Sequence, residues 1–463
     1  MANVVEQLKH LFMPKSVAVI GASRHPGKIG HEILRNLIEY GFEGKIYPIN
    51  PTAEEILGLK VYPSILDVPD EVDLAVISIP AHKVPHVLEE CGEKGVKTTA
   101  IISSGFGEIG NVELEREVLD IARKYGIRIL GPNIIGVVYT PSKLNASFGP
   151  RDVVKGNIAF LSQSGALGIA LMGWTITEEI GLSAVVSLGN KIDIDDADLL
   201  EFFYEDENTR VITIYMEGLR DGRKFMKVAA KVTKKKPVIV LKSGRSERGA
   251  KAAASHTGSL AGADRIFDAA FKQSGVLRAI TFEDMFDWAR ALATQPPVKM
   301  NEAVIITNGG GAGVMATDAA EEYGVNLLEP SPKLTETFRK YMPEFGSPKN
   351  PVDLTGQADA ESYYGAVKAA FESEEVGAII VLYCRTAVLD PMDMAKAVMD
   401  AVKDAKEEGY VKPIVVNLLG GEDTIKASKE LNRKGIPSYP IPERAVKTLG
   451  AMIKWSKWAG YLK

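Results

Sequence analysis

Cysteine and glutamine are scarce in this chain of 463 residues, and no apolar run is long enough to span a membrane. The two cysteines, Cys91 and Cys384, lie far apart in the sequence. Their number excludes a disulfide framework and a cysteine-rich zinc or iron–sulfur site, and it predicts a cytoplasmic location. The scarcity of glutamine and cysteine beside many lysines and glutamates also indicates a thermophilic origin.

An excess of positive charge is absent as well. The chain has 55 Lys and Arg against 60 Asp and Glu, and a general nucleic-acid binder would usually be basic. The first ten residues include Glu6 and lack the apolar core of a signal peptide. We therefore expect neither a nucleic-acid partner nor a membrane partner. With 46% hydrophobic residues, the chain can bury sizeable cores, and its length predicts about three domains.

Short aliphatic runs, each bounded by Gly, Pro or Asn, recur along the whole chain, and helical patterns such as 31–40 and 112–125 separate them. This alternation of strands and helices predicts an α/β protein with parallel, doubly wound sheets. The expected strands are 16–20, 45–49, 74–79, 99–102, 157–161, 183–187, 211–215, 237–241, 303–307, 378–382 and 413–417.

Two breaks divide this series into three tandem units. The segment 139–151 has the composition of a loop, and a second break falls at 294–298, where two prolines are adjacent. We therefore predict three parallel-sheet domains, which comprise residues 1–145, 146–295 and 296–463.

The first predicted strand ends in a glycine-rich turn, residues 21–30, that leads into a helix. Such a turn places backbone N–H groups and a helix dipole against a phosphate. The glycine spacing fits neither a Walker A loop nor G-x-G-x-x-G, and the second strand ends at Asn50-Pro51 without the acid that usually binds the ribose of NAD. The turn therefore predicts a nucleotide-like ligand, and CoA fits better than NAD.

The second and third units open with similar turns between a strand and a helix, at residues 162–168 and 307–313. Their small residues allow the backbone to approach a phosphate closely. One such turn is weak evidence, because tight turns of this type need glycine in any case. Two of them in consecutive domains could converge on a single phosphate from opposite sides.

The segment 242–262 is rich in small and cationic residues, and it contains His256 between Ser255 and Thr257. A neutral imidazole with one free nitrogen is a good phosphoryl acceptor. Its other N–H needs a partner, and Glu217, at the end of a predicted strand in the same domain, suits that role. We therefore expect His256 to be the nucleophile and Glu217 to orient it.

Two other groups of polar residues favour structural interpretations. The acidic cluster at 191–198 resembles a metal site, but it lacks the EF-hand pattern and precedes a helix that it can cap. His82 and His86 are four residues apart on a probable helix, and no third ligand is visible. We therefore expect no metal site in this chain.

Taken together, five motifs resemble those of the α subunit of the ADP-forming (NDP-forming) acyl-CoA synthetases, a branch of the succinyl-CoA synthetase superfamily. The motifs lie at 162–168, 216–218, 254–262, 307–313 and 350–356. The resemblance extends over essentially the whole chain, and the motif around His256 is the most specific. It implies a Rossmann-like CoA-binding domain followed by two flavodoxin-like ligase domains.

The resemblance also implies a reaction, the reversible conversion of acyl-CoA, phosphate and ADP to acid, CoA and ATP. Phosphate would attack the thioester to give an acyl phosphate, and His256, oriented by Glu217, would take the phosphoryl group and deliver it to ADP. The residues matched to phosphate binding are Ser162, Ser164, Gly165, Gly310 and Gly311. The residues matched to CoA binding are Gly21, Ser23, Lys28, Asn50, Pro51, Ser78, Pro80, Ser103 and Gly105.

The acyl and thioester site implied by the resemblance comprises Asn133, Ile134 and Asp353. Succinyl-CoA synthetases commonly have Cys-Pro where this chain has Ile134-Ile135. The more apolar pair suits acetate or another short monocarboxylate rather than a dicarboxylate.

No sequence remains for an ATP-grasp domain, because all three units are already assigned. The resemblance therefore implies a separate ATP-grasp β subunit that binds ADP or ATP with Mg²⁺, in an α2β2 assembly. Three alternatives stay open: a succinyl-CoA synthetase-like ligase for another acid, a non-catalytic CoA-binding sensor, and an NAD-dependent redox protein. The presence of His256 and Glu217 argues against a sensor, and the missing acid at Asn50 argues against NAD.

Overall fold

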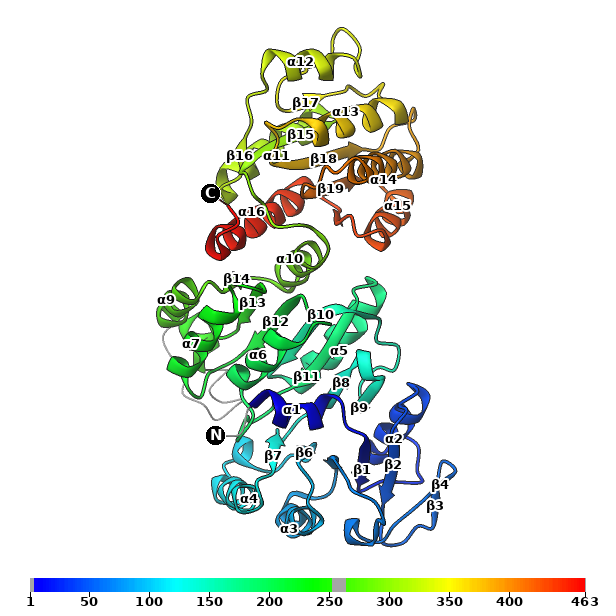
Figure 1. The fold of residues 1–463 in the computed structure, drawn as a ribbon, viewed down its shortest axis with the longest axis vertical. Coiled ribbons are helices and arrows are strands. Elements are labelled where there is room, and N and C mark those ends of the chain that lie inside the picture. Colours follow the sequence, from blue (N-terminus) through cyan, green and yellow to red (C-terminus); the bar gives the residue numbers. More distant parts are fainter. Residues whose placement is uncertain (1–3, 252–263, 463) are drawn as a thin grey trace. The chain divides into compact units, whose positions relative to one another are not determined.

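The computed structural model describes residues 4–251 and 264–462. It shows an α/β protein in which helices alternate with the strands of three large sheets (Figure 1). The chain divides into two compact units, Met1–Arg278 with two of these sheets and Ala279–Lys463 with the third. The expectation of an α/β protein with a series of parallel sheets is therefore confirmed.

The first sheet consists of five parallel strands in the order β2-β1-β5-β6-β7. Its strands are β1 (Ser16–Ile20), β2 (Lys45–Ile49), β5 (Leu74–Ile77), β6 (Thr98–Ile101) and β7 (Arg128–Leu130). All residues of β1, β5 and β6 are buried, which explains why the sequences of β1 and β5 are nearly continuous apolar runs rather than alternating patterns. Since the strand order reverses between β1 and β5, a ligand crevice is expected at their carboxyl ends.

Three helices accompany this sheet, α2 (Ile29–Glu39), α3 (Val84–Lys94) and α4 (Val112–Tyr125), and a small hairpin joins β3 (Glu55–Ile56) to β4 (Leu59–Lys60). In α4 only Val118 and Ala122 are buried, and these two residues are one helical turn apart. Gly126 ends α4 in a left-handed conformation. The apolar stripe and the glycine cap explain why this helix matches its expected limits.

The second sheet has seven strands in the order β14-β13-β12-β10-β11-β8-β9. The strands are β8 (Gly136–Tyr139), β9 (Leu144–Ser147), β10 (Lys155–Ser162), β11 (Leu182–Ser187), β12 (Val211–Met216), β13 (Val238–Lys242) and β14 (Leu277–Ala279). The strands from β11 to β13 are parallel, whereas β8 is antiparallel to both β11 and β9. Its helices are α5 (Gly165–Thr177), α6 (Asp196–Glu205), α7 (Gly222–Val232) and α9 (Asp264–Ser274).

The expectation of a loop throughout 139–151 is wrong, because this segment contains β9. Asn145 and Ser147 give β9 a polar, loop-like composition, but both are buried, and the Ser147 hydroxyl donates to the Asn145 side-chain oxygen at 2.7 Å. The predicted domain limit at 145 therefore falls inside a strand of the second sheet. The limits of the three predicted domains, at 145 and 295, stay predictions, while the compact units meet at 278–279.

The third sheet forms the core of the second unit, in the order β16-β15-β18-β19-β20 with β17 added beside β15. The strands are β15 (Glu302–Thr307), β16 (Asn326–Leu327), β17 (Val352–Asp353), β18 (Ala378–Cys384), β19 (Ile414–Leu419) and β20 (Ser438–Tyr439). The helices are α10 (Phe282–Thr294), α11 (Gly310–Tyr323), α12 (Pro332–Arg339), α13 (Ala360–Glu372), α14 (Pro391–Glu407), α15 (Glu422–Arg433) and α16 (Pro442–Ala459). The pairs of β15 with β16, β17 and β18, of β18 with β19, and of β19 with β20 are all parallel.

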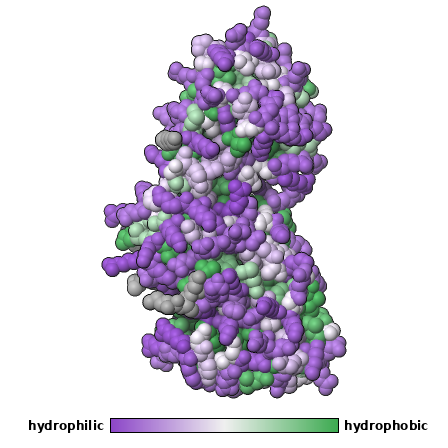
Figure 2. Space-filling view, viewed as in Figure 1, coloured by the Kyte–Doolittle hydropathy of each residue, from purple (hydrophilic) through white to green (hydrophobic). Residues whose placement is uncertain are grey.

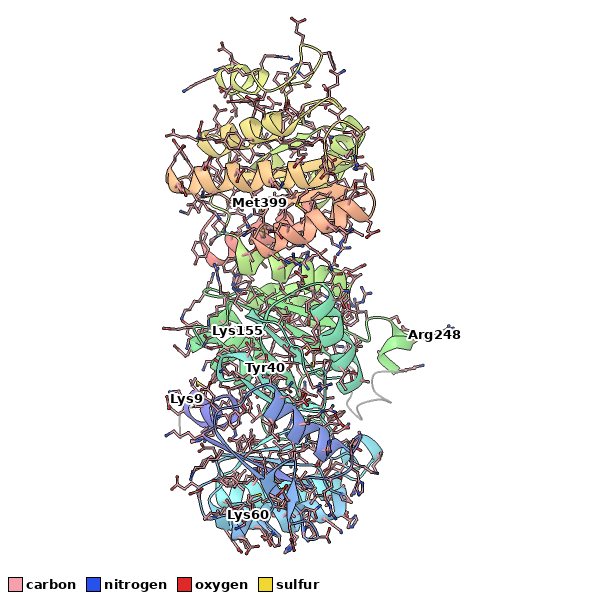
Figure 3. All side chains as sticks on the ribbon, turned by 90° about the vertical axis from the view of Figure 1, so that its right-hand side faces the viewer. Lys9, Tyr40, Lys60, Lys155, Arg248 and Met399 are labelled. Carbon is pink, nitrogen blue, oxygen red and sulfur yellow. The ribbon has the colours of Figure 1, made fainter. Side chains whose placement is uncertain are left out.

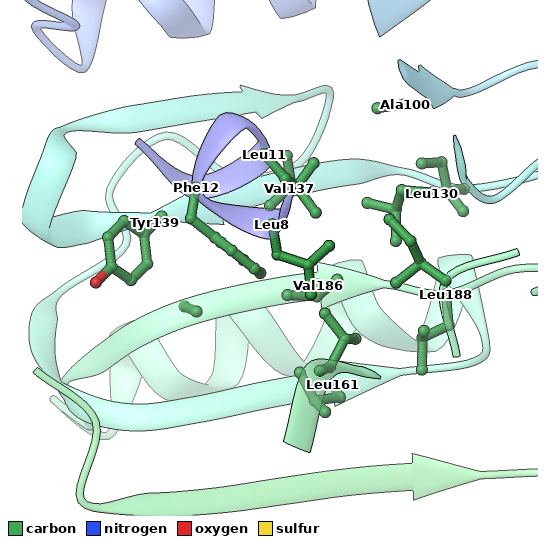
Figure 4. Close-up of a cluster of buried hydrophobic side chains, with 14 of the residues drawn as sticks. Leu8, Leu11, Phe12, Ala100, Leu130, Val137, Tyr139, Leu161, Val186 and Leu188 are labelled. Carbon is green, nitrogen blue, oxygen red and sulfur yellow. The ribbon is translucent and has the colours of Figure 1, made fainter. Parts of the chain in front are cut away.

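Helix α1 (Val4–Phe12) packs between the two sheets of the first unit. Its residues Leu8, Leu11 and Phe12 are fully buried in one cluster with side chains from both sheets, as Figure 4 shows. The Phe12 ring stacks on Phe202 of α6, with ring centroids 4.2 Å apart. One apolar core therefore joins the first two sheets.

Two observations concern the polarity of the helices and of the visible surface. Within residues 4–251 and 264–462, we find no helix with the length and apolar character that crossing a membrane requires. The face of the molecule in Figure 2 is mostly hydrophilic, with apolar residues in separate patches.

The packing of α1 predicts a large effect for Phe12→Ala. Removing a fully buried aromatic ring from a shared core costs about 3–5 kcal/mol of unfolding free energy. Urea unfolding of the first unit, followed by circular dichroism, should show this loss. Ile109→Ala is the control, because Ile109 is 72% exposed and should change stability by less than about 0.5 kcal/mol. Equal stability of the two variants would contradict the packing of α1 between the sheets.

Candidate active site

The residues matched to CoA all lie at the carboxyl edge of the first sheet. They follow four neighbouring strands, β2, β1, β5 and β6. Gly21, Ser23 and Lys28 belong to the turn after β1, Asn50 and Pro51 follow β2, Ser78 and Pro80 follow β5, and Ser103 and Gly105 follow β6. The structure therefore brings these nine residues to one edge, at the reversal of strand order where ligands of such sheets bind.

Two glycines make the turn after β1 unusually tight. Gly21 has a φ of +90°, and a Cβ atom there would lie 2.6 Å from the carbonyl oxygen of Ser78. A Cβ atom on Gly30 would lie 2.0 Å from the carbonyl oxygen of Gly21. Lys28 is the N-cap residue of α2 and makes no side-chain cap bond. Because neither Gly21 nor Gly30 has a side chain, the start of α2 can approach β1 this closely, and its backbone N–H groups suit a phosphate group such as those of CoA.

Several of the polar side chains matched to CoA also hold the edge together. Asn50 donates to the carbonyl oxygen of Ala22 at 2.8 Å, and this bond joins the loops after β2 and β1. Ser78 donates to Ile20 at 3.2 Å, and Ser103 donates to Ile79 at 2.5 Å. These side chains therefore have a structural role of their own, in addition to any contact with a ligand.

A cavity of about 430 Å³ lies in the first unit, between this edge and the second sheet. Its lining residues come from both sheets, and they are Ile29, Ile102, Ser104, Asn133, Ile134, Ile135, Phe148, Gln163, Ser164, Gly165, Ala166, Ile169, Gly189, Asn190, Lys191, Gly218, Leu219 and Arg220. The set includes Asn133 and Ile134, which were matched to the thioester, and Ser164 and Gly165, which were matched to phosphate. The cavity therefore joins residues that were assigned to two different ligands.

The two sheets are connected beside this cavity by backbone hydrogen bonds between 129–133 and 190–194, which we call the inter-sheet connection. Ile194 donates to Ile129 at 3.1 Å, Ile192 to Gly131 at 3.1 Å, and Asn190 to Pro132 at 3.0 Å. Arg128 adds ion pairs to Asp193 and Asp198, at 2.8 and 2.7 Å. The loop that carries Asn133 is therefore fixed to both sheets.

The acidic cluster at 191–198 has the structural role that was expected. Asp193 and Asp198 pair with Arg128, and Asp195 caps α6 by accepting from the N–H of Asp198 at 2.9 Å. Lys191 pairs with Asp196 at 2.8 Å. In the part of the chain that the structure describes, no group of three or more His, Cys, Asp or Glu side chains could hold a metal ion. His86 is instead an exposed side chain 3.8 Å from Glu90.

The turn after β10 presents the start of α5 to the cavity. Ser164 is the N-cap residue of α5 and makes no side-chain cap bond, and Gly165 begins the helix. The loop at 131–135 carries Asn133 and Ile134, and we call it the thioester loop. A Cβ atom on Gly165 would lie 3.2 Å from Ile135, so glycine permits the close approach of this loop. Ser162 does not line the cavity; it is buried, and its hydroxyl donates to the carbonyl oxygen of Ser164 at 2.7 Å.

Glu217 directly follows β12 and is 6% exposed. Its backbone N–H donates to the side-chain oxygen of Gln163 at 2.9 Å, and the N–H of Gly218 donates to the same oxygen at 3.0 Å. The buried Lys191 donates to this oxygen at 3.1 Å and to the carbonyl oxygen of Gly218 at 2.7 Å. The position of Glu217 is thus fixed by two residues that sequence reasoning did not assign to the site.

His256 and the rest of its motif lie at 252–263, outside the described residues. The chain that precedes them leaves the second sheet at Lys242, whose side chain is buried. Burial lowers the pKa of Lys242 below its usual value. Arg248, farther along, is exposed and projects away from the fold (Figure 3). The role of His256 stays a prediction.

The turn after β15 belongs to the second unit. Like the turn after β10, it leads into a helix that begins with glycine and has no side-chain cap bond. Gly310 begins α11, and the N-cap residue Gly309 makes no side-chain cap bond. Asp353 lies close to this turn, because a Cβ atom on Gly310 would be 3.2 Å from its carboxylate. Burial raises the pKa of the neighbouring Cys384 thiol, and the charge of Asp353 raises it further. Gly310, Gly311 and Asp353 thus meet at one end of the third sheet, and their phosphate and acyl roles stay predictions.

Three family models match the chain in succession. Residues 15–140 match a CoA binding domain, residues 155–292 match a succinyl-CoA ligase like flavodoxin domain, and residues 303–463 match a ligase-CoA domain. The order of these matches agrees with the order of the three sheets.

Three relatives of known name match this chain over almost its whole length. The alpha subunit of acetate–CoA ligase [ADP-forming] I from Pyrococcus furiosus is 63% identical, over 97% of this chain and 98% of that protein. The alpha subunit of acetate–CoA ligase [ADP-forming] II from the same organism is 44% identical, over 98% and 99% of the two chains. The acetate–CoA ligase [ADP-forming] of Methanocaldococcus jannaschii is 45% identical over 97% of this chain, which spans only 63% of that relative. The two organisms of the relatives named here are thermophiles, in agreement with the thermophilic composition.

A solved structure has the same fold over the full length. It is the dinucleotide forming acetyl-coenzyme A synthetase 1 from Ca. Korarchaeum cryptofilum in complex with phosphate and ADP, which is 51% identical, with a TM-score of 0.95 and coverage of 98% of both chains. The domain matches, the named relatives and this structure agree, and this chain therefore belongs to the family of the ADP-forming acetate–CoA ligase alpha subunits.

Proposed function

We propose that this chain is the catalytic alpha subunit of a ligase that interconverts acyl-CoA, ADP and phosphate with a carboxylic acid, CoA and ATP. The observation that carries this proposal is the cavity of about 430 Å³ in the first unit, which residues from both of its sheets line. Ile29 and Ser104 line it beside the CoA edge, and Ser164 and Gly165 line it at the start of α5. A thioester held from one side and a phosphate held from the other can therefore react in the same space.

In the first step, a phosphate oxygen attacks the thioester carbonyl carbon. The carbon–sulfur bond breaks, CoA leaves as the thiolate and takes up a proton, and an acyl phosphate remains. The backbone N–H groups and the dipole at the start of α5 suit a bound phosphate there. The apolar side chains of Ile134, Ile135 and Phe148 beside this position favour acetyl or another short monocarboxylic acyl group over a dicarboxylic one.

In the second step, a nitrogen of His256 attacks the phosphorus of the acyl phosphate. The bond between phosphorus and the acyl oxygen breaks, the carboxylate leaves, and phosphohistidine forms. Glu217 would accept the hydrogen bond from the other ring nitrogen and so leave the attacking nitrogen unprotonated. Transfer of the phosphoryl group to ADP completes the cycle.

The site for ADP or ATP with Mg²⁺ is proposed to lie on a partner, an ATP-grasp β subunit in an α2β2 assembly. Support comes from the Methanocaldococcus jannaschii relative, since more than a third of its length lies outside the match to this chain. The solved relative with phosphate and ADP also supports these two ligands. A cytoplasmic location is proposed because Cys91 and Cys384 are both free thiols.

The comparisons do not favour the alternatives. The relatives named above are acetate–CoA ligases rather than succinyl-CoA synthetases or sensors. An NAD-dependent reaction would need an acid at the end of β2, where this chain has Asn50 bonded to Ala22.

The central prediction concerns His256→Ala. The complex of this chain with its partner, incubated with acetyl phosphate and Mg²⁺, should gain one acid-labile and base-stable phosphate by intact mass. His256→Ala should remove this phosphate and lower the ligase rate by more than about 10³-fold, because the nucleophile is lost.

His86→Ala is the matched control, because the His86 side chain is 80% exposed and is not among the residues assigned to the site. It should keep both the phosphate and the rate. Phosphate that persists in His256→Ala, or a wild-type complex that binds CoA and yet gains none, would disprove transfer through His256.

A second prediction tests the CoA edge. In Gly30→Ala, the new Cβ atom would overlap the backbone of Gly21, so the turn must open and CoA should bind about tenfold more weakly. Gly222→Ala is the control, since a Cβ atom there meets no atom within 4 Å. Calorimetric titration with CoA and with NAD measures both variants. Tighter binding of NAD than of CoA to the wild type would contradict the assignment.

A further inference from the structure

A short turn after β11, at 189–191, lies between the two loops that the proposed reaction uses. Gly189 and Lys191 both have a φ of +54°. A Cβ atom on Gly189 would lie 2.1 Å from the carbonyl oxygen of Pro132, so this turn packs tightly against the thioester loop. All three of its residues line the cavity. The turn is therefore placed to contact both sides of the site.

Toward the second sheet, the turn holds the loop that carries Glu217. The Lys191 side chain is 2% exposed, and an ammonium group has three N–H donors. Three acceptors lie within reach of them: Gly218 at 2.7 Å, Asp196 at 2.8 Å and Gln163 at 3.1 Å. Because these contacts use all three donors, Lys191 has none left for a substrate. It acts on the backbone around Glu217 instead.

Gln163 and Arg220 extend this contact. The Gln163 oxygen that accepts from Lys191 also accepts from the N–H groups of Glu217 and Gly218. The Arg220 guanidinium donates to the carbonyl oxygen of Lys191. The loop from 217 to 220 is therefore bonded to Lys191 through the side chain and through the backbone.

Toward the first sheet, the turn holds the loop after β6, which carries Gly105 and which we call the CoA loop. The side-chain amide of Asn190 donates to Glu108 and to Glu115, both at 2.7 Å. Glu108 in turn accepts from the backbone N–H groups of Gly105 and Phe106. Burial acts to raise the pKa of Glu108, but the hydrogen bonds from Gly105, Asn190 and Phe106 outweigh it and lower this pKa, so the carboxylate stays charged. Asn190 thus supports the loop that carries Gly105.

We propose that the turn at 189–191 is a positioning element of the ligase site, in which Lys191 sets the place of Glu217 and Asn190 sets the place of the CoA loop. This inference rests on the proposed roles of Glu217 and His256. Burying an ion pair costs free energy relative to an apolar pair of the same size, so stability alone does not account for Lys191 and Asp196. Fixing the place of Glu217 beside the loop that carries Asn133 does account for them.

The test measures two quantities, the rate of His256 phosphorylation and the KM of acetyl-CoA. A general loss of structure would impair both, whereas the proposed roles affect one each. The complex is assayed for His256 phosphorylation from acetyl phosphate in a single turnover, and for the KM of acetyl-CoA in the full reaction. Lys191→Met should slow phosphorylation about 10- to 100-fold and leave the KM of acetyl-CoA within about twofold. Asn190→Ala should raise that KM about tenfold and leave phosphorylation within about twofold.

Two further variants guard against a folding defect. Lys191→Met with Asp196→Leu removes both charges, so no buried charge is left without a partner, and it should slow phosphorylation as Lys191→Met does. Lys236→Met is the matched control, because Lys236 is also a buried lysine that donates to carbonyl oxygens, those of Phe203 and Asp206, but does not line the cavity. It should leave both measurements unchanged.

Glu217→Gln separates this inference from the proposed function. If Glu217→Gln slows phosphorylation while the double variant at 191 and 196 phosphorylates at the wild-type rate, the positioning role is disproved and the proposed function stands. Equal loss of both measurements in Lys191→Met and in Asn190→Ala would also disprove it. If Glu217→Gln itself phosphorylates at the wild-type rate, the role of Glu217 fails, and the inference fails with it.

Discussion

Three backbone hydrogen bonds between 129–133 and 190–194 join the first two sheets, and the proposed site depends on them. They run from the end of β7 to the segment after β11, beside the carboxyl edges at which ligands of parallel sheets bind. The ion pairs of Arg128 fix the same segments from the side chains. Because of this connection, a loop of the CoA edge and the start of α5 line one cavity rather than two.

The strands and the order of units could be predicted from the sequence because parallel strands are buried on both faces. Their aliphatic runs are therefore unbroken, as in β1 and β5, and the glycine turns mark where each strand ends. The short strand β9 could not be found in this way. It is held by its pairing with β8 and by a hydrogen bond from Asn36 of α2 to the carbonyl oxygen of Ser147, and neither is visible in local composition.

The site was predictable only in part, for a similar reason. Gly21, Ser164, Gly165 and Gly310 stand in turns whose chemistry is local, so the sequence indicates them. Gln163, Asn190 and Lys191 act through contacts with residues as far as 82 positions away, as in the bond from Asn190 to Glu108. Gln163 lies inside a motif that was recognised, and its position between two small serines was the one available signal. For Lys191, the acidic neighbours offered a choice between a metal site and a helix cap, and they gave no sign of the loop that it supports.

The free-energy cost of burying the ion pair of Lys191 and Asp196 depends on temperature. Water solvates charged groups less favourably as temperature rises, so the free-energy cost of keeping this pair dry is greatest in the cold. A cell that grows in hot water can therefore hold a loop in place with a rigid, charged anchor at a cost that a cold-adapted protein would have to offset elsewhere. In cold-adapted relatives we would look for an apolar pair at these two positions.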